Sequence, residues 1–420
     1  MPCATARSNF NLDVEILYDE IEGMSATPRT HLFIVLAVVG LALNLRPALA
    51  AIGPLLDSIE SATGMSSTQA SLLTTVPVFV MGVCALAGGR LRRWLGERNG
   101  IGLGIALIAL ACGLRLAASG RYGLLATAVM AGIGIALVQT LLPAFIKRCF
   151  GARAGNVMAL YTTGIMAGAA VAAAAVAGVA AVGGWPMALA VWAVPAVLAV
   201  PLWYVASRQQ RVNHMQETLA ACAPPAFWRN GRAWQLMVFF GIGTGAYTLV
   251  LAWLPPFYTG LGWQPSAAGF LLGALTLTEV VAGLAVSALI GRFPDRRVPL
   301  YTVLLMLLAG LLCLIIAPLP LALPACLLLG CGIGALFPLS LIVALDHADS
   351  PSRAGELASF VQGGGYIIAS CMPLLAGVLR DRFADLTQAW MIMALGAVVL
   401  IGLSTRFAPA TYGHITNLRP

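Results

Sequence analysis

Two ionisable side chains lie deep inside long apolar stretches of the sequence, where a charged group needs a specific reason to be. Arg46 lies within Leu43-Asn44-Leu45-Arg46-Pro47-Ala48, and Glu279 lies within another apolar stretch. A guanidinium presents a planar fork of hydrogen-bond donors that suits a small anion. A carboxyl group removed from water favours its protonated form, so it can carry a proton. The pair therefore predicts anion binding at Arg46 and proton transfer at Glu279.

Each of the two residues can instead have a purely structural role. Arg46 can be held by a carboxylate purely for packing, and Glu279 can be that carboxylate or a helix-packing hydrogen-bond partner. The cost of burial favours a function for Arg46, since an arginine at mid-bilayer costs about 2.5–3.5 kcal/mol on insertion scales. We expect it about three residues past the centre of its helix, about 4–5 Å at 1.5 Å per residue. Pro47 donates no backbone hydrogen bond, so it loosens the helix beside the charge.

Glu279 belongs to a polar stripe on its own helix. Thr276, Glu279, Gly283 and Ser287 follow one another at spacings of 3, 4 and 4 residues, which places them on one helical face. We expect this face to look into a central cavity.

Further polar groups within apolar stretches are candidate substrate contacts, with an interhelical hydrogen bond as the alternative for each. Asn44 precedes Arg46 closely, and Tyr247 shares a helical face with Thr244 and Thr248. The other candidates are Gln139, Gln362 and Tyr366. Trp253, followed by Pro255-Pro256, is a candidate gating residue or a member of an aromatic belt at the membrane interface.

The composition shows which solvent must surround these groups. Of the 420 residues, 60% are hydrophobic and 10% are charged, whereas a soluble domain has roughly 25% charged residues. The chain must therefore lie in a lipid bilayer. The net charge of +8 would suggest nucleic acid as the partner of a soluble chain, but here the basic residues occupy short segments between apolar stretches. We expect no nucleic-acid partner. The scattered cysteines and histidines predict no metal and no cofactor.

A helix needs about 20 apolar residues to cross the bilayer, and that length predicts twelve spans. Residues 1–30 form a polar N-terminal tail, residues 207–232 a polar linker that contains Pro224-Pro225, and residues 407–420 a C-terminal tail. The linker separates a six-helix bundle at 31–206 from a second one at 233–406. The expected spans are 31–56, 67–88, 100–118, 122–146, 156–181, 185–206, 233–257, 266–290, 299–317, 321–345, 359–379 and 387–406.

The basic residues orient these spans. If the N-terminus is cytoplasmic, nineteen Lys and Arg residues fall on the cytoplasmic side and four on the other, namely Arg115, Arg121, Arg380 and Arg382. External loops such as 57–66 carry acidic residues. Positive residues concentrate on the inside, so both termini are predicted to be cytoplasmic in a multi-pass protein of a bacterial-type inner (plasma) membrane.

The two halves resemble each other at a constant shift of 200 residues. Gly132-Ile133-Gly134 matches Gly332-Ile333-Gly334, and Arg153-Ala154-Gly155 matches Arg353-Ala354-Gly355. Six spans per half make the repeats parallel, as in major facilitator carriers, whose site lies between the halves near the midplane. The predicted fold class is an all-α membrane protein of twelve transmembrane helices in two parallel six-helix repeats, the major facilitator fold. The counterpart of Arg46 falls at Ala246, beside Tyr247.

Several motifs are missing from the sequence. It contains no GxxxxGK[ST] phosphate loop, no HExxH and no GxSxG. We therefore expect neither ATP-driven transport nor an enzyme, and a membrane enzyme or a transporter-derived sensor remains a remote alternative.

Short motifs along nearly the whole chain resemble the cyanate/nitroimidazole transporter family of the major facilitator superfamily. The chain is more similar to its cyanate-transporting members, through the Asn-Leu-Arg-Pro and Ala-Leu-Asp-His stretches. The loop after the second span is also similar to the superfamily signature, but Arg93 stands where the signature has an acid. The quoted motifs are Asn44-Leu45-Arg46-Pro47, Gly53-Pro54-Leu55-Leu56, Leu142-Pro143-Ala144-Phe145-Ile146-Lys147-Arg148, Ala252-Trp253-Leu254-Pro255, Leu345-Asp346-His347 and Arg406-Phe407-Ala408-Pro409.

The resemblance implies a small-solute substrate such as cyanate, moved by alternating access. Uptake of an anion against an inside-negative potential costs about 2.3 kcal/mol per 100 mV, so accumulation needs a co-transported proton or exchange for another anion. The alternative function is proton-driven export of a nitroimidazole-like drug or metabolite. We expect the chain to act as a monomer.

Overall fold

The computed structural model describes residues 28–118, 120–151, 154–208, 227–347 and 351–409, and every regular element in these ranges is a helix. Most of the predicted tails and linker lie outside the described residues. The first group of helices comprises α2 (Pro28–Leu45), α3 (Pro47–Ala50), η1 (Gly53–Leu55), α4 (Leu56–Thr63), α5 (Ser67–Leu86), α6 (Gly88–Leu95), α7 (Glu97–Leu114), α8 (Arg121–Phe150), α9 (Ala154–Ala190) and α10 (Ala193–Ala206).

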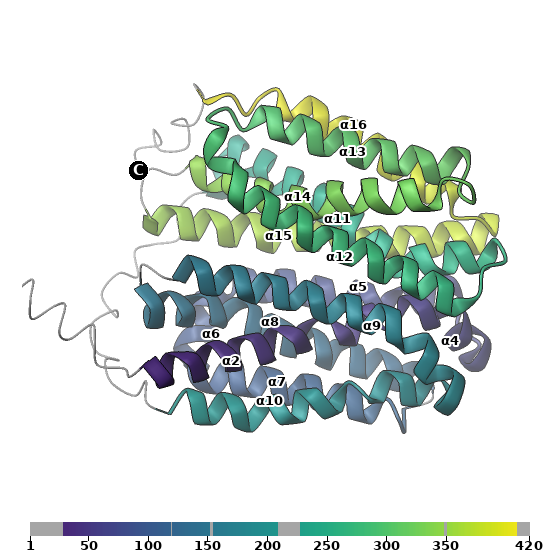
Figure 1. Ribbon diagram of the computed structural model, residues 1–420, viewed down its shortest axis with the longest axis horizontal. Helices are drawn as coiled ribbons and strands as arrows, with labels where there is room; N and C mark the ends of the chain where they lie inside the picture. Colours follow the sequence, from purple (N-terminus) through teal and green to yellow (C-terminus); the bar gives the residue numbers. More distant parts are fainter. Residues whose placement is uncertain (1–27, 119, 152–153, 209–226, 348–350, 410–420) are drawn as a thin grey trace, which may run out of the picture.

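The second group follows residue 227. It comprises η3 (Phe227–Arg229), α11 (Gly231–Gly260), α12 (Pro265–Leu289), η4 (Ile290–Arg292), α13 (Arg297–Ile316), α14 (Ala322–Asp346), α15 (Pro351–Phe383) and α16 (Thr387–Ser404). Figure 1 shows the two groups stacked on each other, the purple-to-blue helices below and the green-to-yellow helices above. They meet where α5 packs against α15 and where α9 packs against α12.

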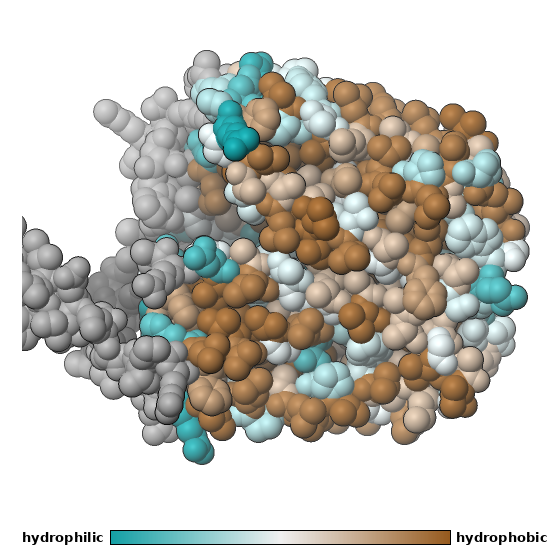
Figure 2. Space-filling view, viewed as in Figure 1, coloured by the Kyte–Doolittle hydropathy of each residue, from teal (hydrophilic) through white to brown (hydrophobic). Residues whose placement is uncertain are grey.

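A chain of this kind must expose apolar side chains to its solvent. Large hydrophobic residues are more than half exposed on helices of both groups, including Leu36, Val171, Leu198, Leu277 and Leu327. Figure 2 shows apolar residues covering much of the broad side, with the most hydrophilic ones mostly toward its two ends. This surface suits hydrocarbon rather than water, which confirms the membrane assignment made from composition.

The number of crossings depends on one glycine. The described helices include 11 continuous stretches long and apolar enough to span a membrane, and one of them, Ala154–Ala206, has 53 residues. At about 1.5 Å per residue it is far too long for one crossing of about 30 Å. Gly184 interrupts it with φ 76° and ψ 169°, a conformation that glycine adopts without strain. The chain turns back there, as predicted between 181 and 185, so this stretch supplies two of twelve crossings.

The first predicted span, 31–56, is not one regular helix. Helix α2 ends at Leu45, Arg46 is the N-cap of the four-residue helix α3, and η1 follows from Gly53. The reason is chemical, because Pro47 and Pro54 cannot donate the backbone bonds that a continuous helix needs. The segment 57–66, predicted as a loop, instead begins with α4, which ends at Gly64 with φ 65°.

The glycine repeats bring neighbouring helices into close contact, but not in the same order. A Cβ on Gly134 would lie 2.5 Å from the Gly104 carbonyl oxygen of α7, and one on Gly132 would lie 2.6 Å from Pro77 of α5. In the second group Gly332 approaches α13 and Gly334 approaches α12. Each Gly-x-Gly motif thus lets its helix, α8 or α14, pack closely against two neighbouring helices. The first glycine of one motif corresponds to the second glycine of the other in the neighbour that it contacts.

This packing predicts that alanine substitutions at two glycines will affect the stability of the protein differently. Gly134→Ala forces α7 and α8 apart, and overpacking of this kind costs about 1–3 kcal/mol of unfolding free energy. Gly178, with nothing within 4 Å of its Cβ position, is the matched control. We expect the purified Gly134→Ala protein to melt several degrees below wild type in detergent and Gly178→Ala to melt at or above it. Equal melting temperatures would contradict the packing argument.

Candidate functional site

A cavity of about 210 Å³ lies between the two helix groups, and Arg46, Gln139, Tyr247 and Glu279 are on its wall. It is built from the break between α2 and α3 together with α8, α9, α11, α12 and α14. Apolar side chains form much of the rest, namely Ile165, Met166, Val280, Leu284, Ile333, Phe337, Pro338 and Leu341. A few polar groups on a mainly apolar wall are the usual composition of a small-molecule site.

The cavity opens toward one end of the bundle. We call this end the terminal face, where α2 begins and α16 ends. The wall includes Thr162 near the start of α9 and Ser287 near the end of α12, and both side chains are exposed. At the other end of the same helices Gly269 and Gly273 pack against Ala173 and Ala174. The helices α9 and α12 therefore touch away from the terminal face, whereas cavity-lining side chains nearer to it are exposed.

Arg46 occupies the cavity wall at the helix break. The residue is 4% exposed, and its guanidinium carbon lies 5.3 Å from the centre of the Tyr247 ring. Its Nε atom has no hydrogen-bond partner. Among the described residues no carboxylate lies within the 4.0 Å of an ion pair with Arg46. This arrangement does not fit an arginine clamped by a carboxylate for packing.

Glu279 faces Arg46 across the cavity from the second helix group. It is 3% exposed, its Oε2 atom lacks a partner, and it interacts electrostatically with Arg46. Gly334 of α14 fixes the position of its backbone, since a Cβ on Gly334 would lie 2.3 Å from the Glu279 Cα. Gly283 and Ser287 of the predicted stripe also line the cavity. Thr276 is buried, and its hydroxyl donates to the Leu272 carbonyl.

Four buried polar atoms without a hydrogen-bond partner belong to residues that line this cavity. Besides Arg46 Nε and Glu279 Oε2, the Tyr247 hydroxyl and Gln139 Oε1 have no hydrogen-bond partner, and all four residues line the wall. Buried polar atoms are nearly always paired. Four unpaired ones around the same space are available to a ligand or to water.

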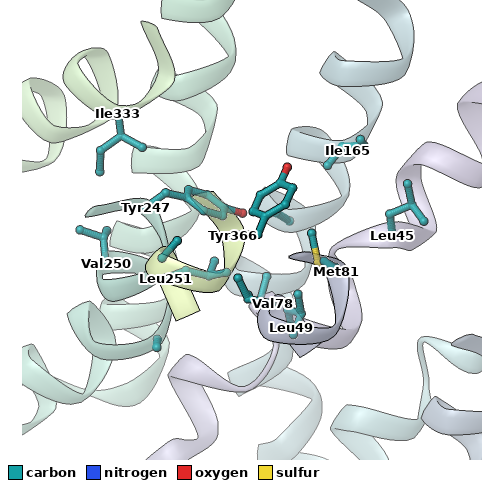
Figure 3. Close-up of a cluster of buried hydrophobic side chains, with 14 of the residues drawn as sticks. Leu45, Leu49, Val78, Met81, Ile165, Tyr247, Val250, Leu251, Ile333 and Tyr366 are labelled. Atoms are coloured by element: carbon teal, nitrogen blue, oxygen red, sulfur yellow. The ribbon is translucent and has the colours of Figure 1, made fainter. Parts of the chain in front are cut away.

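The other predicted contacts lie at different distances from this wall. Tyr366 of α15 and Tyr247 of α11 lie close together among buried apolar side chains of both helix groups (Figure 3), and Tyr366 interacts with Arg46. Gln362, one turn before Tyr366, is half-buried and does not line the cavity. Asn44 faces elsewhere, since its amide donates to the carbonyl oxygens of Gly40 at 2.7 Å and Pro195 at 3.4 Å.

The face opposite the terminal face is closed by contacts between the groups. Arg380 of α15 pairs with Asp57 of α4 at 2.7 Å and with Glu60 at 3.6 Å. The carboxylate of Asp381 accepts bonds from the backbone N–H groups of Ser67 and Thr68, both at 2.9 Å. Beneath these charges a Cβ on Gly53 would lie 2.5 Å from the Leu251 carbonyl oxygen. The backbones of the two groups therefore approach closely at this face.

Trp253, the predicted gating residue, lies in this closure. It is fully buried, its indole N–H donates to the Pro373 carbonyl at 3.0 Å, and the Arg380 guanidinium carbon lies 5.4 Å from its ring centre. Its ring therefore supports Arg380 from below.

Several residues with interactions in the structure gave no functional signal in the sequence. Tyr161 of α9 is buried and interacts with Arg46, but a tyrosine in an apolar helix gave no signal by itself. Glu97 supplies the acid that is absent at Arg93. It pairs with Arg148 at 2.8 Å and lies 3.8 Å from Arg92, within the first group. The Asp346 of the Leu-Asp-His motif pairs with Arg296 at 2.9 Å and does not line the cavity.

Comparison with known proteins agrees with this architecture. A model of the Major Facilitator Superfamily matches residues 32–370. The chain is 36% identical to the cyanate transport protein CynX of Escherichia coli (strain K12), over 91% of this chain and 99% of that protein. It is 30% identical to a 2-nitroimidazole transporter of the same organism, over 90% and 94%. The solved structure of a D-xylose-proton symporter superposes with a TM-score of 0.76 at 14% identity, covering 90% and 98%.

The closure predicts an accessibility change. Arg380→Gln removes two ion pairs between the groups, each worth about 0.2–1 kcal/mol, so we expect the ratio of closed to open form to fall about fivefold. The readout is labelling of Ala252→Cys, a 2% exposed position, by a membrane-impermeant maleimide in a background without the native cysteines. Exposed Arg382, two residues further along, gives the control Arg382→Gln, which should leave the rate unchanged. Equal rates in both variants would refute the role of Arg380.

Proposed function

The chain belongs to the Major Facilitator Superfamily, and from that premise we propose that it carries a small monovalent anion such as cyanate across the inner (plasma) membrane, coupled to a proton or to exchange. The single observation that carries this proposal is the buried Arg46 guanidinium on the cavity wall, with an unpaired Nε and no ion pair among the described residues. The 36% identical relative is named a cyanate transport protein, which gives the anion its first candidate.

An anion fits the wall because it supplies what the buried groups lack. A buried charge without a partner raises the free energy of the folded protein, because nothing compensates for the water that it has lost. A bound anion accepts hydrogen bonds from the Arg46 guanidinium and from the Tyr247 hydroxyl, both oriented by the helix break and by their mutual contact at 5.3 Å. A cation at the same place would face repulsion from Arg46.

Glu279 provides the coupling. When it is ionised, its negative charge lies across the cavity from Arg46 and competes with a substrate anion for the same guanidinium. When it is protonated, Arg46 is free to bind the anion. Binding of the proton and of the anion therefore favour each other, and this reciprocity is required by linkage. One anion and one proton moved together carry no net charge, so the membrane potential neither drives nor opposes the step.

Alternating access follows from the two ends of the cavity. We take the terminal face as cytoplasmic, from the bias of the basic residues, so the described conformation is open inward and closed outward. Outward opening must separate Arg380 from Asp57 and Gly53 from Leu251, while α9 and α12 close over Thr162 and Ser287. Trp253 acts as a gating residue in this step, because its ring holds Arg380 in the closed position.

A second candidate is proton-driven export of a nitroimidazole-like compound. The favouring observation is the apolar wall formed by Met166, Phe337 and Leu341 in a cavity of about 210 Å³, which is more space than cyanate fills. A panel of labelled cyanate and nitroimidazoles in vesicles, with imposed gradients of pH and voltage, separates the two candidates by substrate and direction.

Arg46→Gln should abolish uptake of labelled cyanate. Truncating one partner of a buried, hydrogen-bonded charge pair costs about 2–5 kcal/mol, which corresponds to a loss of about 30-fold or more in affinity. Arg46→Lys keeps the charge without the fork and should retain part of the uptake. The measurement is initial uptake into vesicles, normalised to transporter in the membrane, with exposed Arg121→Gln as control. Unchanged uptake by Arg46→Gln would reject the assignment.

Glu279→Gln should uncouple transport from the pH gradient. A glutamine keeps the size of the side chain but neither gains nor loses a proton, so an imposed inward proton gradient should no longer accelerate uptake, while exchange of cyanate at equal pH continues. Glu356→Gln, on α15 and away from the cavity, is the control carboxylate and should respond to the gradient as wild type does. If Glu279→Gln retains the wild-type response, the proton passes elsewhere.

A further inference from the structure

A second arginine, Arg115, lies buried near the helix break and does not line the cavity. We propose that Arg115 is a positioning residue for the anion site: from the end of α7 it holds the short helix α3 and thereby fixes Arg46. The proposal rests on the proposed function only for its transport readout, since the geometry itself needs no substrate.

The burial of Arg115 needs an explanation. Its side chain is 1% exposed, among the largest fully buried side chains of the described residues. None of the described carboxylates forms an ion pair with it. Its partners are instead the Ala48 carbonyl oxygen, 2.8 Å from Nη1, and the Thr127 hydroxyl, 3.4 Å from Nε. Arg115 is also the C-cap of α7, where a helix dipole favours a cation.

The Ala48 carbonyl is available because the helix is broken. In a regular helix the Ile52 N–H would donate to it, but that N–H donates to the Leu49 carbonyl at 3.1 Å. The backbone N–H groups of Leu49 and Ala50 both donate to the Arg46 carbonyl at 2.9 Å. A freed carbonyl in a membrane interior costs several kcal/mol unless a donor reaches it. Arg115 is that donor, and the Ala48 carbonyl that it reaches lies two residues beyond Arg46.

The anchor on the other side of this bond is rigid. Thr127 belongs to α8, and its hydroxyl in turn donates to the Leu124 carbonyl at 2.8 Å. Helices α7 and α8 pack closely through Gly104 and Gly134. The α3 segment, in contrast, is a four-residue helix flanked by breaks. The bond therefore transfers the fixed position of α7 and α8 to the least regular part of the first span.

Two functional contacts lie on the segment that Arg115 holds. Arg46 begins it, on the cavity wall, and Gly53, in backbone contact with Leu251, follows it in the closure. Losing the anchor should loosen both. A misplacement of about 1 Å at a binding group can cost about 10²-fold in rate, so the effect on anion binding should exceed the effect on the amount of folded protein.

The transport experiment compares three variants by KM for labelled cyanate and by maximal rate per transporter. Arg115→Met keeps the length of the side chain without donors, and we expect its KM to rise about tenfold with less than a twofold change in maximal rate. Arg115→Lys can make one of the two bonds, with an expected rise of about threefold. Arg98→Met is the matched control at the other end of α7, where Arg98 bonds Ser207 at 3.0 Å and the Tyr204 carbonyl at 3.2 Å.

Each outcome of this experiment supports or overturns the positioning role of Arg115. A wild-type KM in Arg115→Met, or an equal KM rise in Arg98→Met, overturns the proposal. If Arg115→Met does not accumulate in the membrane, Arg115→Lys decides, since a threefold KM rise supports positioning and a wild-type KM overturns it.

A second readout does not depend on the substrate. Ile52→Cys, at a 1% exposed position of the held segment, is labelled from outside intact cells with a membrane-impermeant maleimide in a background without native cysteines. We expect labelling to accelerate severalfold when Arg115→Met is added and to stay unchanged with Arg98→Met. If wild type does not transport cyanate, the proposed function fails, yet unchanged labelling in Arg115→Met would still separately overturn the positioning role.

Discussion

A helix that breaks inside a membrane must still satisfy its backbone, and this constraint organises the structure. Pro47 and Pro54 interrupt the first span, and the interruption makes Arg46 the N-cap residue of a four-residue helix, with its side chain on the cavity wall. A regular helix would leave no irregular backbone for α7 and α11 to contact. The break instead supplies a carbonyl for Arg115 and a glycine that meets the Leu251 backbone. Charge placement, cavity and closure therefore share one local cause.

The two helix groups contribute unequal chemistry to the cavity. The positive charge comes from the first group, at the N-cap of α3, whereas the carboxyl group of Glu279 and Tyr247 come from the second. Their interaction depends on how the groups face each other, so relative movement of the groups changes the electrostatics that a bound ion experiences. An internal repeat would suggest matching residues at matching positions, but the position shifted by 200 residues from Arg46 is Ala246, a buried alanine. The internal repeat therefore extends to the helices but not to the polar residues of the cavity.

The sequence predicted what the membrane imposes and little of what depends on side-chain direction. Twelve spans, the two-part fold and the presence of Arg46 and Glu279 on one cavity follow from apolar length and from the cost of buried charge. The direction of Asn44 did not follow, because residues two apart on a helix face different neighbours, and here the break adds a further rotation. Arg115 was assigned only to the non-cytoplasmic side, because its bond to Ala48 depends on a carbonyl that the broken backbone leaves free.

A fixed cation in an apolar wall is useful only if its field is opposed at the right moment. A fixed positive charge on the wall attracts an anion in every conformation, and an anion held that strongly would not be released. In the proposed mechanism a carboxyl group across the cavity solves this problem, because on losing its proton it would compete for the same guanidinium and release the anion. Arg46 and Glu279 line the same cavity and form no ion pair in the described conformation, so room for cargo remains in that cavity. A permanent ion pair would occupy that room, and a neutral pair would attract no anion; one fixed and one titratable charge avoids both failures.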